Sequence, residues 1–139
     1  MKIQTETIEI ETVGFSDIQD ITPQVAEIVR KHDLKDGTVT VFVSGATAGV
    51  TTIEFEPGLL RDFPLLFEQL APQDAKYHHD MTWHDGNGFS HVRASLLGPS
   101  ITIPFADRKL TLGTWQQVVV VDFDNKPRRR RIVVQASGE

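Results

Sequence analysis

Four of the five histidines in this 139-residue chain, His78, His79, His84 and His91, fall within one short stretch. Neutral imidazole is the most common metal ligand among side chains, and catalytic zinc sites take three protein ligands and a water. The spacing His79-x4-His84-x6-His91 matches no pair of ligands on one helix face, so three ligands would have to converge through loop geometry. The histidines would equally well cap turns and bond to loop backbone. The chain has no cysteine, so any metal must be held by nitrogen and oxygen.

Carboxylates stand close to these histidines in the sequence and also in a preceding strand-like run. Asp80 and Asp85 are suited to accept the second ring N–H of a metal-bound imidazole, which would orient the ring. Glu54 and Glu56 share one face if their segment is extended, and such a pair could supply a metal ligand and a general base. The alternative, favoured without further observations, is that they are solvated residues at a helix N-terminus, where the helix dipole stabilises negative charge.

The only basic run is Lys126-Pro127-Arg128-Arg129-Arg130-Arg131. The planar fork of donors on arginine suits phosphate, but the same run could form a charged hairpin edge that blocks edge-to-edge pairing. Alternation along a strand would place the four arginines on two faces, so not all of them can serve one site. We expect at least half of them to be structural.

Hydrophobic patterning predicts strands and two helices around these residues. Strands are expected at residues 2–12, 38–44, 50–55, 91–97, 101–105, 115–123 and 130–136, and helices at 22–35 and 57–71. Residues 73–90 have no usable periodicity, and an irregular stretch of this length is often functional. We therefore expect one α+β domain over residues 1–139, with a two-layer, largely antiparallel, sandwich-like sheet and two helices.

Composition excludes several classes of function. The chain carries 14 Lys and Arg against 19 Asp and Glu, a formal net charge of −5, which disfavours nucleic acid as a partner. No stretch approaches the roughly 20 apolar residues that span a bilayer, and the first residues lack the apolar core of a signal peptide. We expect a cytoplasmic protein without a membrane partner. Motifs of nucleotide-binding loops, serine hydrolases and helical zinc proteases are absent.

Four segments together resemble the YjbQ-like family, whose members are often labelled secondary thiamine-phosphate synthase enzymes. They are Thr51–Gly58, Tyr77–His91, Val92–Ser100 and Leu112–Gln117, and the resemblance extends over nearly the whole chain. It implies a compact α+β fold with a sandwich-like sheet. It also implies a homotrimer with a site near a subunit interface, and a metal bound by histidines.

Carried onto this sequence, the resemblance implies His79 and His91 as metal ligands, with His84 as the third candidate. Phe89 stands where close relatives often carry histidine, which removes one ligand from the choice. The expected cofactor is a divalent metal, zinc above all, because imidazole suits zinc better than magnesium. Further site residues implied are Glu54 and Asp80 as catalytic carboxylates, and Asn87, Gln116 and Arg93 as binding residues.

Three functions remain open at this stage. The first is a metal-binding enzyme of the family with thiamine-phosphate synthase activity, which joins a pyrimidine diphosphate to a thiazole phosphate. The second is metal-assisted hydrolysis of a small phosphorylated or amide substrate, with Glu54 deprotonating the water. The third is a trimeric protein that binds a small molecule or a metal without turnover.

Overall fold

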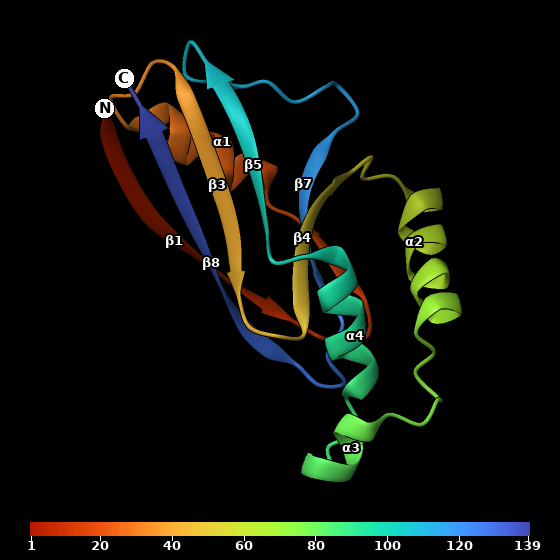
Figure 1. Ribbon diagram of the computed structural model, residues 1–139. Helices are drawn as coiled ribbons and strands as arrows, with labels where there is room; N and C mark the ends of the chain where they lie inside the picture. Colours follow the sequence, from red (N-terminus) through yellow and green to blue (C-terminus); the bar gives the residue numbers. More distant parts are fainter.

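Two antiparallel sheets face each other in the computed structural model, which describes all of residues 1–139 (Figure 1). The larger sheet has the order β1 (Lys2–Thr12), β8 (Arg128–Gly138), β3 (Gly37–Ser44), β5 (Ser100–Ala106) and β6 (Lys109–Leu110). The smaller sheet has the order β2 (Asp17–Asp20), β7 (Gln117–Asp122) and β4 (Ala48–Ile53). All the pairings are antiparallel. The α+β class and the antiparallel sheets expected from the sequence are confirmed.

The main core lies between the two sheets. Alternate residues of β3, Val39, Val41 and Val43, are fully buried there, as the two-residue period of a strand requires. Helix α1 (Thr22–Lys31) begins at Thr22-Pro23, as expected, and adds Val25 and other apolar side chains to this cluster.

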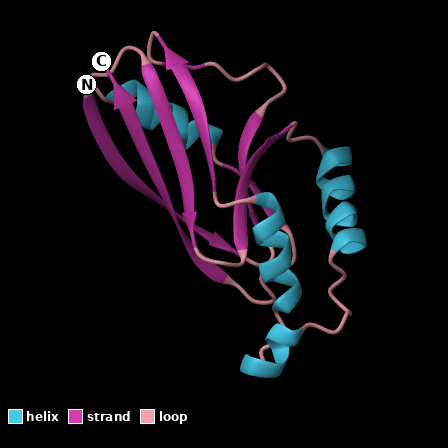
Figure 2. Cartoon of the chain, viewed as in Figure 1, coloured by secondary structure: helices cyan, strands magenta, loops and turns pink.

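A second, smaller core lies on the opposite face of the smaller sheet, under helices α2 (Pro57–Leu70) and α4 (Gly88–Leu97) (Figure 2). Strand β7 belongs to both cores, with Val118 and Val120 in the first and Val119 and Val121 in the second. Burial on both faces explains why this strand is a continuous apolar run. No helix of the structure has the length and apolarity needed to cross a membrane.

The prediction of two helices is wrong, because the structure has four. Residues 91–97, expected to be a strand, belong to α4, and the irregular stretch 73–90 contains helix α3 (His78–Trp83). The inner face of α4 carries Phe89 and Ala94 but also the polar Ser90 and Arg93, whereas the apolar Val92 and Leu96 are exposed. The usual apolar stripe of a buried helix is therefore interrupted, and the pattern favoured a strand.

Candidate functional site

Three segments that are distant in sequence enclose a cavity of about 400 Å³ at one end of the molecule. They are the β3–β4 loop, the pair of helices α3 and α4, and the beginning of β8, which meet at the lower end of the sheets in Figure 1. We call it the histidine cavity, and its lining residues are Gly45, Ala46, Thr47, His79, Trp83, Asp85, Asn87, His91, Arg128 and Arg130.

The two histidines of this cavity lie against each other. His79 stands in α3 and His91 in α4, and their ring centroids are 4.2 Å apart with an angle of 36° between the planes. Nδ1 of His79 lies 3.4 Å from Oδ1 of Asp80 and 3.7 Å from Oδ1 of Asp85. His79, Asp80 and Asp85 each offer one ligand atom, and these atoms lie within 4.8 Å of one another. The arrangement offers a metal both imidazole and carboxylate donors.

Burial lowers the pKa of His91 below its ordinary value of 6.5, and the neighbouring His79 lowers this pKa further. The carboxylates of Asp124, Asp85 and Asp80 act in the opposite direction without reversing the shift. The His91 ring is therefore neutral at neutral pH. Neutral imidazole is the form that binds metals.

Asn87 joins the helices to the end of the smaller sheet. This buried residue precedes α4, and its Nδ2 donates a 3.2 Å hydrogen bond to Oδ1 of Asp124. The amide oxygen Oδ1 of Asn87 is shielded from solvent and has no donor. A buried acceptor without a donor costs about 1–3 kcal/mol, and such a group in a native protein calls for an explanation such as a bound ion or water.

The opposite wall of the cavity carries two arginines, each paired with a fully buried carboxylate. Asp122 accepts hydrogen bonds from Nε and Nη2 of Arg130, at 2.6 and 3.0 Å. Asp124 accepts one from Nε of Arg128 at 2.8 Å. Nη1 of Arg130 and both Nη nitrogens of Arg128 make no hydrogen bond to the protein. These nitrogens are free to bind an anion in the cavity.

The basic run divides between two faces, as strand alternation predicts. Arg129 points away from the cavity, where it forms an ion pair with Glu9 of β1, and Arg131 is exposed. Only Arg128 and Arg130 line the cavity.

Two residues expected in the site lie at the other end of the smaller sheet. Glu54 follows β4, an extended strand of six residues that places it roughly 20 Å from the beginning of that strand beside the cavity. Gln116 binds Thr52 and the Gly113 backbone at that same far end. Glu56 caps α2 by accepting hydrogen bonds from the backbone N–H groups of Gly58 and Leu59.

Three further residues predicted for the site lie closer to the histidine cavity than Glu54 and Gln116 do, and each has a different role. Asp80 accepts a 2.8 Å hydrogen bond from the Gly88 backbone N–H, which ties α3 to the beginning of α4. His84 is exposed just after α3 and does not line the cavity. Arg93 is buried on another face of α4, where it donates to Glu68 at 2.6 Å and stacks on Phe89. The structure therefore brings His79, His91, Asp80 and Asn87 together, and leaves the others outside.

Asp122 and Asp124 were missed by sequence reasoning. Both follow the apolar run of β7 at a spacing of two, and Arg128 and Arg130 follow at the same spacing in β8. The two-residue spacing shared by the aspartate pair and the arginine pair was the sequence signal that could have identified Asp122 and Asp124.

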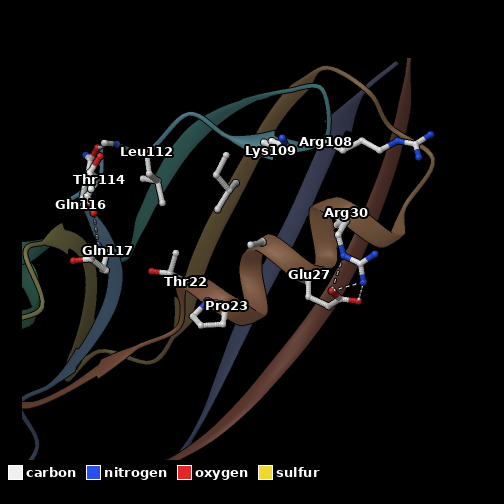
Figure 3. Close-up of a pocket in the computed structure, with 13 residues that line it drawn as sticks. Thr22, Pro23, Glu27, Arg30, Arg108, Lys109, Leu112, Thr114, Gln116 and Gln117 are labelled. Atoms are coloured by element: carbon white, nitrogen blue, oxygen red, sulfur yellow. Dashed lines mark hydrogen bonds and ion pairs between the residues drawn. The ribbon is translucent and has the colours of Figure 1, made fainter.

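A second cavity, of about 480 Å³, lies between α1 and residues 108–117 (Figure 3). Its arginines are occupied, because Arg30 forms an ion pair with Glu27 at 2.7 Å and Arg108 with Asp33 at 2.9 Å. Gln116 and Gln117 also make their hydrogen bonds within the protein. Although it is larger, this cavity has Lys109 as its only charged side chain without a partner, whereas the histidine cavity combines free arginine nitrogens with two imidazoles.

Comparison with known proteins shows which family the chain matches. The model of the family described as "UPF0047 protein YjbQ-like" matches residues 6–139. A UPF0047 protein of Archaeoglobus fulgidus is 38% identical over 129 residues, which cover 93% of this chain and 98% of that protein. A UPF0047 protein of Methanothermobacter thermautotrophicus is 34% identical and covers 100% of this chain and 95% of its own length.

Solved structures agree with these sequence matches. A YbjQ-like protein of unknown function from Sulfolobus solfataricus superposes with a TM-score of 0.89 at 29% identity, over 99% of this chain and 100% of that one. A protein of the yjbq/upf0047 family from Clostridium acetobutylicum gives a TM-score of 0.87 at 32% identity, over 95% and 99%. The family model and the relatives cover nearly the whole chain, and the chain belongs to the YjbQ-like (UPF0047) family.

Proposed function

We propose that the histidine cavity binds a divalent transition metal, zinc above all, and hydrolyses a small phosphorylated substrate. The observation that carries this proposal is the juxtaposition of two walls around one cavity. One wall holds the paired imidazoles of His79 and His91, and the other holds the free guanidinium nitrogens of Arg128 and Arg130.

The donor atoms present fit such a metal. Catalytic zinc commonly takes three protein ligands from imidazole and carboxylate groups. We assign this role to His79 and Asp85, whose ligand atoms lie within 4.8 Å of each other, and to His91, whose ring centroid lies 4.2 Å from that of His79. Asp85 takes the place that the sequence suggested for His84, which lies outside the cavity. The unpaired Oδ1 of Asn87 adds a nearby acceptor that a cation or its water would satisfy. When bound, a divalent ion supplies Lewis acidity toward water and phosphoryl oxygens.

The protein groups around the metal position have distinct roles in this proposal. Asp80 orients the His79 ring, while its bond to Gly88 keeps the two helices together. Arg128 and Arg130 bind the phosphate group, and arginine forks match phosphate oxygens well. Imidazole-rich donors favour zinc over the oxygen-seeking magnesium that typically accompanies a diphosphate leaving group. Hydrolysis is therefore a better match for this site than thiamine-phosphate synthesis.

We also propose that the protein is a homotrimer. Its support is a set of exposed apolar side chains on the outer helices, among them Leu65 and Leu70 of α2 and Leu96 of α4, each about three-fifths exposed. Within one subunit, Glu54 is too distant to act on a substrate at His79. A catalytic role for Glu54 therefore requires that it come from a neighbouring subunit.

The proposal is tested by zinc content and turnover in a matched pair of variants. Zinc per subunit is measured by elemental analysis after loading and desalting, and phosphate release is followed over a panel of phosphorylated metabolites. We expect the wild-type protein to hold one zinc per subunit, His91→Ala to lose both the zinc and the turnover, and the control His84→Ala to keep both.

The opposite results are equally informative. A wild-type protein that never holds stoichiometric metal, or a His91→Ala variant that keeps it, would overturn the metal site. Tight phosphate binding without product across the panel would reject hydrolysis in favour of a protein that only binds its ligand.

A further inference from the structure

Asp124 is a fully buried carboxylate that contacts both walls of the histidine cavity. Its Oδ1 accepts hydrogen bonds from Nδ2 of Asn87 at 3.2 Å and from the Asn125 backbone at 2.8 Å. Its Oδ2 accepts from Nε of Arg128 at 2.8 Å and from the hydroxyl of Thr47 at 3.0 Å. Oδ2 of Asp124 also forms a longer ion pair with Nη2 of Arg130 at 3.7 Å. Asp122, the other fully buried carboxylate, holds Arg130 with two hydrogen bonds, bonds to Thr12 and does not reach the helices.

On the side of the helices, Asp124 acts through Asn87. The backbone carbonyl of Asn87 accepts hydrogen bonds from the N–H groups of Ser90 and His91, at 2.9 and 3.4 Å, in the first turn of α4. Fixing Asn87 therefore fixes the turn that carries the His91 ring. This bond is one of two hydrogen bonds that tie the region before α4 to the end of the smaller sheet, and the other runs from Nδ2 of Asn125 to the backbone carbonyl of Asp85 at 2.8 Å.

On the other side, Asp124 acts through Arg128. The Arg128 side chain is partly exposed and lines the cavity, and the bond from Nε is its only hydrogen bond to the protein. The guanidinium is planar, so the hydrogen bond from Nε restricts its orientation and with it the directions of both Nη nitrogens. A carboxylate buried this completely holds the arginine with less screening by water than a surface pair.

We propose that Asp124 is a positioning residue that prepares the two walls separately, the metal wall through Asn87 and the anion wall through Arg128. The proposal rests on the proposed function, because it assigns the metal and the phosphate to these walls. It predicts that different substitutions of Asp124 lower the affinities for zinc and for phosphate to different extents. Substitution of a residue with a merely structural role would lower both affinities together.

The substitution Asp124→Asn separates the two roles. The new amide oxygen can still accept from Asn87 and Asn125, and its NH₂ can donate to the Thr47 hydroxyl, but it cannot accept from Arg128. We expect phosphate affinity to fall roughly 10-fold or more, with zinc affinity changed less than about 3-fold. Asp124→Ala removes both contacts, and we expect both affinities to fall.

The measurement is calorimetric titration of zinc into the metal-free protein and of inorganic phosphate into the zinc-loaded protein. A double-mutant cycle with Arg128→Ala asks whether Asp124 acts through this arginine. In the Arg128→Ala background, Asp124→Asn should lower phosphate affinity much less than in the wild-type background, and the remaining loss comes from the 3.7 Å ion pair between Asp124 and Arg130. Arg129→Ala is the control for charge, since Arg129 faces away from the cavity and should leave phosphate affinity unchanged.

Arg128→Lys provides a test that does not depend on the folding of the Asp124 variants. Lysine keeps the charge but has one nitrogen, which cannot bond to Asp124 and reach the anion as a fork does. We expect it to bind phosphate nearly as weakly as Arg128→Ala. Full affinity in Arg128→Lys, additive losses in the cycle, or equal losses of zinc and phosphate in Asp124→Asn would overturn the positioning role. A wild-type protein that binds neither ligand would instead overturn the proposed function, and this inference with it.

Discussion

At the scale of single residues, the site combines residues that could be identified from the sequence with residues that could not. His79 and His91 were identified because imidazole is a common metal ligand and the family resemblance supports these two, whereas the clustering alone fitted a structural role equally well. Asp124 was not, because an aspartate before Asn125 reads as an ordinary turn residue. Its importance depends on complete burial between Asn87 and Arg128, and burial of one side chain cannot be seen in local spacing.

A pH dependence of stability follows from Asp124. Burial by itself raises the pKa of this carboxyl, but hydrogen bonds from Asn125, Asn87, Arg128 and Thr47 together outweigh it and hold the pKa below its ordinary value of 3.8. A depressed pKa in the folded state stabilises the protein above the unfolded value, and this contribution is lost as the pH falls through the folded value.

We therefore expect the free energy of unfolding to decrease steeply below pH 3.8 in the wild-type protein and less steeply in Asp124→Asn. Urea denaturation at a series of pH values measures both slopes. Equal slopes in the two proteins would mean that Asp124 has the same pKa folded and unfolded.

At the scale of elements, the sequence predicted the six longer strands, missed the short β2 and β6, and assigned a strand to residues 91–97, which belong to helix α4. β3 alternates cleanly because one of its faces is in the core and the other is not, and α1 has a proline at its beginning and an apolar stripe. α4 has neither signal: its buried face holds Ser90 and Arg93, whose polar groups are satisfied by the Asn87 carbonyl and by Glu68. Arg93 is suited to burial by a tertiary partner, Glu68 of α2, and the local pattern of residues does not reveal such a partner.

The cap of α2 gives a prediction at this scale. Glu56→Ala should lower the free energy of unfolding by about 1 kcal/mol, because two backbone N–H groups at the helix N-terminus lose their acceptor. Glu54→Ala is the matched control: Glu54 is exposed and makes no side-chain hydrogen bond, so we expect almost no change. Denaturant unfolding measures the free energy of unfolding of both variants. Equal decreases in the two variants would contradict the assignment of the cap to Glu56.

At the scale of the whole molecule, the sequence predicted the α+β class and the antiparallel sheets but not the position of the site relative to Glu54 and Gln116. Those residues were grouped with the histidines because the resemblance included all of their segments. The fold places them at the opposite end of the smaller sheet, so one chain alone cannot combine them. A resemblance between segments does not state how far apart the fold places them.

The proposed trimer is tested by changing the exposed apolar surface of the helices. Leu65→Lys combined with Leu96→Lys places two charges on this surface, and burying them in an interface would be costly. We expect light scattering after size-exclusion chromatography to report three subunits for the wild-type protein and a shift toward monomer for the double variant. Lys substitution at the exposed Ile3 of β1 is the control, and a wild-type monomer would contradict the trimer.

Strand β7 contributes side chains to both hydrophobic cores, and this has a consequence for how the protein unfolds. Neighbouring valines of this strand, Val118 and Val119, belong to different cores, and the backbone between them is hydrogen-bonded to β2 and β4 on either side. Neither core can open without disturbing the ladder that supports the other. Although the apolar contacts form two clusters, we expect the amides of β7 to exchange with solvent only when the whole chain unfolds.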